Sequence, residues 1–137
     1  MARFVADASA TLSWFFEDET TSWTENLLER VKSGDSFVVP AHWLVEVANG
    51  FLVAERRKRI TRKRTDEFLD AIAGLRIEVE PALTPARAKV LLKLSQKYNL
   101  TVYDAAYLDL ARRQGLPMAT LDRDLRQAAS AEGLLLL

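Results

Sequence analysis

The chain has 137 residues, 49% of them hydrophobic, which is enough for one domain with a hydrophobic core of its own. Its 19 basic residues balance its 19 acidic residues, so the net charge argues neither for nor against a nucleic-acid partner. The absence of cysteine excludes disulfides, thiolate metal sites and a cysteine nucleophile. The sequence has neither a signal-peptide pattern nor an apolar stretch of membrane-spanning length, so we expect a cytoplasmic protein without membrane contact.

The predicted elements alternate between strands and helices along the whole chain. In order, the pattern predicts a strand from residue 3 to residue 7, helices at 10–16 and 20–32, a strand at 36–39, a long helix from residue 40, a helix at about 61–74, a strand at 76–79, helices at 84–98 and 101–114, a strand at 117–120, a helix at 122–131 and a strand at 134–137. This alternation predicts a single α/β domain over residues 1–137, with a parallel sheet of about five strands and helices on both faces.

Four acidic residues lie where this layout places the carboxyl ends of the strands. Asp7 ends the first strand, and Glu46 lies in the helix after the second. Asp104 opens the helix after Leu100, and Asp122 follows the fourth strand by two residues. Ligands of open α/β sheets gather beyond the carboxyl ends of the strands, so the sequence predicts a functional site at this edge.

Three of these acids also have a purely structural interpretation. Asp7 can cap the helix that follows it, since Asp is favoured at N-caps. Asp104 lies three residues after Thr101, which is the spacing of a capping box. Asp122 and Asp124 can complement the dipole of a helix start. For each of these acids the structural and functional interpretations stay open.

Glu46 is different, because Val45 and Val47 flank it in a helix that is apolar on most sides. Burying a lone carboxylate there costs roughly several kcal/mol unless a cation or hydrogen-bond donors compensate. The pattern therefore favours a function for Glu46. His42, the only histidine, lies four residues earlier and can share the same helical face, where a capping or packing role is favoured over catalysis.

Convergence of the four carboxylates, with no lysine or arginine among them, would raise their pKa values through mutual repulsion. A bound cation relieves this repulsion. Oxygen-only ligands favour Mg²⁺ or Mn²⁺ over zinc, and the lack of cysteine and of a second histidine points the same way. Such a cluster suits phosphodiester hydrolysis, because one or two ions activate water, hold the phosphate and stabilise the leaving oxygen.

Four motifs, in this order, resemble those of PIN-domain nucleases, and in particular the VapC-type ribonuclease toxins of bacterial toxin-antitoxin pairs. They are Asp7-Ala8-Ser9 after an apolar strand, residues 43–49 with Glu46 and Asn49, residues 103–108 with Asp104, and Thr120-Leu121-Asp122. The resemblance extends over essentially the whole chain. It implies a Mg²⁺-dependent endoribonuclease that hydrolyses RNA.

The resemblance also implies roles for individual residues and partners. The four acids would surround Mg²⁺, with Asp7 and Asp104 as the usual direct ligands. The positions that support the site are Ser9, Asn49, Thr120 and Asp124, the last with a role that stays open. As partners, the resemblance implies a cognate antitoxin whose tail covers the acidic cleft, and often a homodimer, but it does not identify the RNA that is cut.

The main concentration of positive charge is the run Arg56, Arg57, Lys58 and Arg59. It can follow RNA phosphates beside the cleft, or it can be the solvated end of a helix, where cations also favour the dipole. Because only a few phosphates could be neutralised at once, the charge pattern favours a restricted target, such as a tRNA or rRNA loop, over indiscriminate binding.

The strongest alternative is a non-catalytic α/β interaction protein whose acidic residues only cap helices. A phosphatase with an aspartyl nucleophile would need a second Asp two residues after Asp7, where Ser9 stands. A receiver domain would need paired acids on the first strand and a lysine after the last strand, and neither is present. No Gly-rich turn follows the first strand, which argues against a dinucleotide cofactor.

Two further features are assigned to the structure rather than to the site. Asp109 lies five residues after Asp104, well round the predicted helix, and is excluded as a site residue. An aromatic concentration near the N-terminus is more typical of a core than of a surface for an inhibitor peptide or a second copy. It consists of Trp14, Phe15, Phe16 and Trp23.

Overall fold

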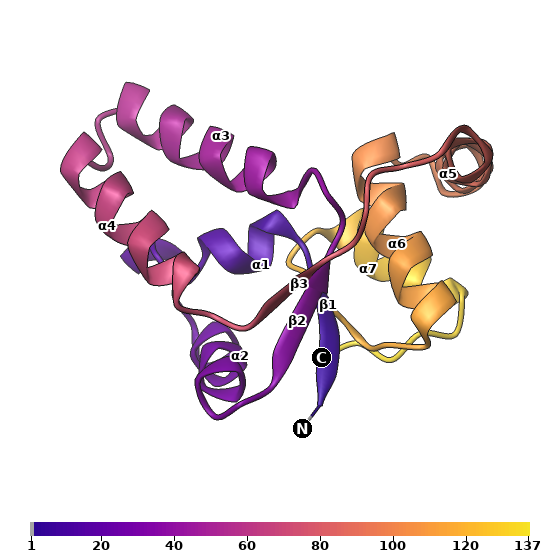
Figure 1. Ribbon diagram of the computed structural model, residues 1–137, viewed down its shortest axis with the longest axis horizontal. Helices are drawn as coiled ribbons and strands as arrows, with labels where there is room; N and C mark the ends of the chain where they lie inside the picture. The colour runs from indigo at the N-terminus through magenta and orange to yellow at the C-terminus, as the bar shows by residue number, and fades with distance from the viewer. Residues whose placement is uncertain (1) are drawn as a thin grey trace.

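The computed structural model describes residues 2–137 and contains a four-stranded parallel sheet with the order β3-β2-β1-β4 (Figure 1). The strands are β1 (Arg3–Ala6), β2 (Ser36–Val39), β3 (Ile77–Val79) and β4 (Met118–Ala119). Val5 pairs with Val38 on one side and with Met118 on the other, which makes β1 a central strand. Its buried apolar residues match this position, because central parallel strands are covered on both faces.

Helices cover both faces of the sheet, as predicted. In Figure 1, α1 to α4 lie on one side of the sheet and α5 to α7 on the other. The helices are α1 (Ala8–Leu12), α2 (Ser22–Lys32), α3 (Trp43–Arg56), α4 (Arg62–Ala73), α5 (Pro85–Tyr98), α6 (Val102–Gln114) and α7 (Arg123–Ala131), with a short 3₁₀ turn η1 (Glu17–Glu19). Within residues 2–137, none of these helices combines the length and apolar character that a bilayer span requires.

Side-chain caps account for the places where most helices begin. Thr21, Thr61, Thr84 and Thr101 each accept a hydrogen bond from a backbone N–H in the first turn of the following helix. These bonds satisfy donors that a helix start leaves without partners. The helix starts predicted at 61, 84 and 101 therefore agree with the structure to within one residue.

Three boundaries differ from the sequence prediction. Pro40 does not begin α3, because a turn follows it and the helix starts at Trp43. The helix predicted at 10–16 is instead the short α1, which starts directly after its cap Asp7. The strand predicted at 134–137 is reduced to one parallel bridge between Met118 and Leu136, because β4 offers only two residues for pairing.

The aromatic residues near the N-terminus pack against the core, as the core interpretation predicts. Phe16 is buried, and Trp14 contacts the buried ring of Phe37 edge-on at 5.7 Å between centroids. Phe15 packs against Phe51 and Phe68. These contacts fix α1 and α3 beside each other, and so hold the residues that follow β1 close to the start of α3.

Candidate active site

Asp7 lies at the carboxyl end of β1 with only 4% of its surface exposed. Its Oδ1 accepts hydrogen bonds from Ser9 Oγ at 2.7 Å and from the backbone N–H of Ala10 at 3.0 Å, and its Oδ2 accepts one from Thr120 Oγ1 at 2.5 Å. Burial raises the pKa of Asp7, and the nearby charge of Asp122 adds to this, although the three donors act against it. An ionised carboxylate offers about four lone-pair positions, so three donors leave room for a cation.

Two hydroxyl groups join the ends of β1 and β4 around Asp7. Thr120 is fully buried, and its Oγ1 also accepts a hydrogen bond from the backbone N–H of Asp122 at 3.0 Å. Ser9 Oγ accepts one from the backbone N–H of Leu121 at 3.2 Å. The structure therefore brings Asp7, Ser9, Thr120 and the start of α7 together at one edge of the sheet.

Asp104 lies in the first turn of α6, half-buried and facing the other acids. Burial is the largest cause that raises its pKa, to about 6, followed by the negative charges of Asp122, Asp7 and Glu46. Its backbone N–H donates to Thr101 Oγ1 at 3.1 Å, so the cap expected there is present. A cap alone does not explain why the charges of three other carboxylates act on this side chain, and this coupling places the four acids in one region of the structure.

Asp122 both caps α7 and belongs to this acidic group. Its Oδ1 accepts a hydrogen bond from the backbone N–H of Leu125 at 2.8 Å. Asp124, in the first turn of α7, is exposed, as is Asn49 on α3. The structure thus places Asp122 beside Asp7 and Asp104, whereas Asp124 and Asn49 lie at the surface of the same helices that carry the acids.

The apolar surroundings expected for Glu46 are present on one side only, because Val47 is fully buried whereas Val45 is exposed. Leu44 and Val45 are 49% and 71% exposed because they lie on the outward face of α3, whereas Trp43 and Val47 on its inner face belong to the core. Glu46 is half-buried and accepts a hydrogen bond from Tyr107 Oη at 2.7 Å, and His42 Nε2 lies 3.2 Å from its Oε1. Burial acts to raise its pKa, but the contacts with His42 and Tyr107 outweigh it and hold the pKa of Glu46 below its usual value.

Tyr107 is the site residue that sequence reasoning missed. It lies one helical turn after Asp104 on α6, and only 1% of its surface is exposed. Its hydroxyl connects α6 to Glu46 on α3, 61 positions away in the sequence. The three-residue spacing from Asp104 was the available signal, since residues three apart share a helical face. His42 packs against the rings of Tyr103 and Tyr107, which fits the expected packing role.

The basic run lies away from the acids. Arg56 ends α3, and the following residues form the turn into α4 at the end of α3 that is remote from the strand ends (Figure 1). Ten residues of helix separate Glu46 from Arg56, which corresponds to about 15 Å. Arg59 pairs with Asp18 at 2.9 Å and with Glu19 at 3.2 Å. In the described part of the chain, the other three cations, Arg56, Arg57 and Lys58, form no ion pair.

Asp109 is a structural residue. It is 3% exposed and lies between Arg87 and Arg113, with Arg113 Nε donating to its Oδ2 at 2.9 Å. Arg113 also contacts Glu80 at 2.5 Å. The ion pairs stabilise the buried charge, so excluding Asp109 from the acidic group was correct for a reason that helical spacing did not reveal.

The acidic group has the chemistry of a site for a hard divalent cation. Asp7, Asp104 and Asp122 form no ion pair with lysine or arginine within residues 2–137, and the atoms that they offer to a metal are all carboxylate oxygens. In the same residues, no three Asp, Glu or His side chains are already placed to hold one ion together. The fit to Mg²⁺ or Mn²⁺ rests on the type of ligand atom, because these ions prefer carboxylate oxygens.

The comparison with known families decides what this arrangement belongs to. The sequence profile of the PIN domain matches residues 4–131. The chain belongs to the PIN-domain family. The fold and the resemblance inferred from the four motifs are thereby confirmed.

Individual relatives of this PIN domain agree with the assignment. The chain is 30% identical to Ribonuclease VapC3 of Pyrobaculum aerophilum over 128 residues, which cover 91% of this chain and 93% of that protein. The fold is similar to the crystal structure of PAE2754 from Pyrobaculum aerophilum, with a TM-score of 0.71, 19% identity and coverage of 93% and 84%. It is also similar to VapBC2 from Rickettsia felis, solved bound to a DNA fragment from their promoter, with a TM-score of 0.66, 14% identity and coverage of 98% and 97%.

Proposed function

We propose that this PIN domain is a metal-dependent endoribonuclease that hydrolyses RNA phosphodiester bonds, and that it is the toxin of a VapBC-type toxin-antitoxin pair. The observation that carries the proposal is the geometry around Asp7, whose buried carboxylate accepts three hydrogen bonds beside the start of α7 and pairs with no lysine or arginine within residues 2–137. The charges of Asp122, Asp7 and Glu46 also act on Asp104 and raise its pKa. A surface carboxylate that serves only a helix start has no need of such neighbours. The identity to a ribonuclease over nearly the full length of both chains supports the same activity.

In this proposal, Asp7 and Asp104 hold Mg²⁺ or Mn²⁺, and the carboxylates of Glu46 and Asp122 add negative charge around the ion. When bound by these residues, the ion would supply positive charge for activating water and for stabilising the phosphate and the leaving oxygen. Ser9 and Thr120 fix the orientation of the Asp7 carboxylate through their hydrogen bonds. Tyr107 and His42 hold Glu46 in its ionised form by the contacts described above. Asn49 and Asp124 border the site.

The non-catalytic alternative accounts for part of the site only. Asp7 and Asp122 do cap α1 and α7, as that alternative requires. Asp104 and Glu46, however, are not N-cap residues, and their side chains face the other acids or Tyr107. Binding of a divalent cation separates the two interpretations, because helix caps alone need no metal.

The proposed partners follow from the same assignment. A cognate antitoxin is supported by the similarity in fold to VapBC2 of Rickettsia felis. A homodimer is supported by the outward apolar face of α3, which includes Leu44, Val45 and Leu52. For RNA phosphates, Arg56, Arg57 and Lys58 are the available cations of the basic run, since Arg59 is paired. We place the protein in the cytoplasm.

The experiment that tests the function maps cleavage sites on total cellular RNA, with Mg²⁺ or Mn²⁺ and with a chelator. We expect one dominant, metal-dependent cut in a tRNA or rRNA loop. Uniform degradation would contradict the selectivity but not the nuclease activity. No cleavage under any metal condition would favour the non-catalytic alternative.

Removal of the Tyr107 hydroxyl tests whether the contact with Glu46 matters. Tyr107→Phe keeps the buried ring but deletes a 2.7 Å hydrogen bond to a carboxylate, a loss of about 1.5–3 kcal/mol. We expect kcat to fall roughly 10-fold and the affinity for Mn²⁺ to decrease, with little change in KM for RNA. The matched control is Tyr98→Phe, which deletes a 2.7 Å bond to Glu132 outside the acidic group. Equal effects of the two variants would argue against a role in the site.

A further inference from the structure

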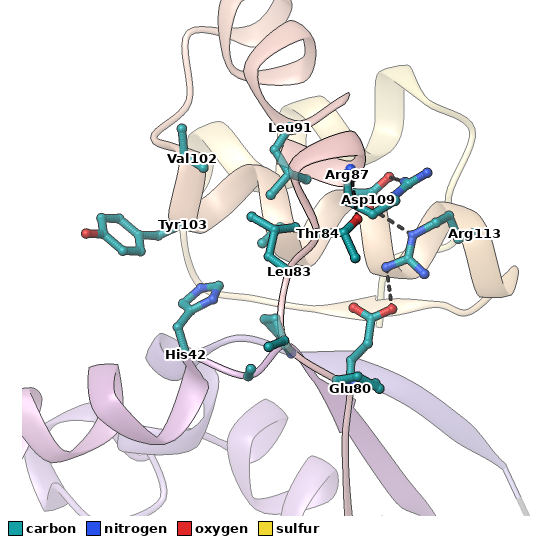
Figure 2. A pocket seen from close by; sticks show the side chains of 15 residues that line it. His42, Glu80, Leu83, Thr84, Arg87, Leu91, Val102, Tyr103, Asp109 and Arg113 are labelled. Atoms are coloured by element: carbon teal, nitrogen blue, oxygen red, sulfur yellow. Dashed lines mark hydrogen bonds and ion pairs between the residues drawn. The ribbon is translucent and has the colours of Figure 1, made fainter. Parts of the chain in front are cut away.

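The residues that follow β2 and β3 line a separate cavity of about 460 Å³ (Figure 2). It lies between the turn at 40–42, the connection at 80–84, and helices α5 and α6. Most of its wall is apolar, with side chains such as Leu83, Leu91, Val102 and Ala106. Its volume falls within the usual range of about 300–1,000 Å³ for pockets that take small organic groups.

Two aromatic rings form the wall that this cavity shares with the acidic group. His42 lines the cavity, and its Nε2 lies 3.2 Å from Glu46. Tyr103 also lines the cavity, directly precedes Asp104 in α6 and is 62% exposed. The two ring centroids are 5.6 Å apart. A group that enters the cavity therefore contacts aromatic surfaces immediately next to the carboxylates.

The charges at the opposite end of the cavity cancel. Figure 2 shows Asp109 and Glu80 joined to Arg87 and Arg113 by ion pairs, on the side away from His42 and Tyr103. Two cations and two anions give this end no net charge, which disfavours a phosphate as occupant. Arg87 also lines the cavity, and 37% of its side chain is exposed, so it adds polar surface to this end.

We propose that this cavity, the base pocket, receives one unstacked nucleobase of the RNA next to the phosphate that is cleaved. The inference rests on the proposed ribonuclease activity and adds a site that selects the substrate. A nucleobase matches the pocket because it is uncharged, has a flat face that can stack on the exposed ring of Tyr103, and has a polar edge for the polar end that Arg87 lines. Continuity with the acids favours RNA as the occupant over a side chain of another protein.

The test fills the pocket by substitution and measures whether one base of the RNA no longer contributes to the affinity. Ala106→Leu adds volume to the wall on α6, and Ala86→Leu, on an exposed part of α5 that does not line the pocket, is the matched control. A second variant, Tyr103→Ala, removes a mostly exposed ring and should leave the fold intact. Each is made with Asp7→Asn, to prevent cleavage, and is titrated with a seven-nucleotide RNA and with versions that lack one base each.

We expect the protein with Asp7→Asn alone to lose about 10-fold in affinity when one particular base is missing, as base–aromatic stacking predicts. With Ala106→Leu or Tyr103→Ala added, the loss of that base should no longer change the affinity. Ala86→Leu should behave like the protein that carries Asp7→Asn alone. Equal losses of affinity on removal of every base, or an unchanged preference for that one base in Ala106→Leu, would overturn the proposed base pocket.

A change of oligomeric state in Ala106→Leu, measured by sedimentation, with RNA binding unchanged, would assign the cavity to a protein contact and also overturn the proposal. Cleavage by the wild-type chain is measured in parallel. If the wild type cleaves RNA with metal but Ala106→Leu keeps the base preference, only the base-pocket proposal is wrong. Absence of wild-type cleavage removes the proposed function, and the binding series still decides whether the cavity holds a base.

Discussion

Asp7→Asn should reduce RNA cleavage by at least about 100-fold and leave the protein folded. The substitution keeps the shape of the side chain, and Asn can still accept the hydrogen bonds from Ser9 and Ala10. It removes the negative charge that a metal ligand requires. Because burial raises the pKa of Asp7, the neutral variant should be at least as stable as the metal-free wild type. Cleavage rates and urea midpoints measure the two effects.

The matched control for this change is Asp70→Asn, which alters an exposed carboxylate on α4. It should leave both the cleavage rate and the urea midpoint unchanged. Wild-type cleavage by Asp7→Asn would remove Asp7 from the site. If Asp7→Asn instead loses cooperative unfolding together with activity, the loss of activity follows from the lost cap of α1 and does not identify Asp7 as a metal ligand.

The sequence predicted the fold because local signals and the global arrangement agree. Thr61, Thr84 and Thr101 mark helix starts, and the apolar runs at β1 and β2 mark buried strands. The final strand was overestimated because four leucines predict a buried strand equally well whether or not a partner is present. Pairing depends on β4, whose two residues limit it to a single bridge.

The candidate site was predicted less completely than the fold. Residue types and strand ends indicate the acids, because the carboxyl edge of a parallel sheet follows from the topology. The environment of Glu46 was misjudged, since hydropathy describes Val45 and not whether another element covers it. The contact with Tyr107 depends on how α3 and α6 pack against the sheet, and no local pattern in either helix contains that information.

The metal-free protein should lose stability through Asp104 as the pH rises from about 4 to 7. The pKa of Asp104 is about 6 in the folded chain, above its ordinary value of 3.8, so between these values the folded state holds the proton more tightly. The stabilising contribution is complete below the unfolded pKa and is lost as the pH rises through the folded pKa. The shift corresponds to at most about 3 kcal/mol, and solvent screening of this half-exposed carboxylate reduces it to roughly 1–2 kcal/mol.

The Asp104→Asn substitution and the addition of Mg²⁺ should each abolish the loss of stability that the metal-free wild type shows between pH 4 and pH 7. The neutral variant should gain stability relative to the metal-free wild type at pH 7 but not at pH 4, measured by urea unfolding with chelator present. Mg²⁺ requires the ionised carboxylates, so millimolar Mg²⁺ should raise the Tm of the wild type at pH 7.5 more than at pH 5. It should have a much smaller effect on Asp104→Asn. A wild-type Tm that is independent of Mg²⁺ at both pH values would show that the acids repel one another without serving a metal.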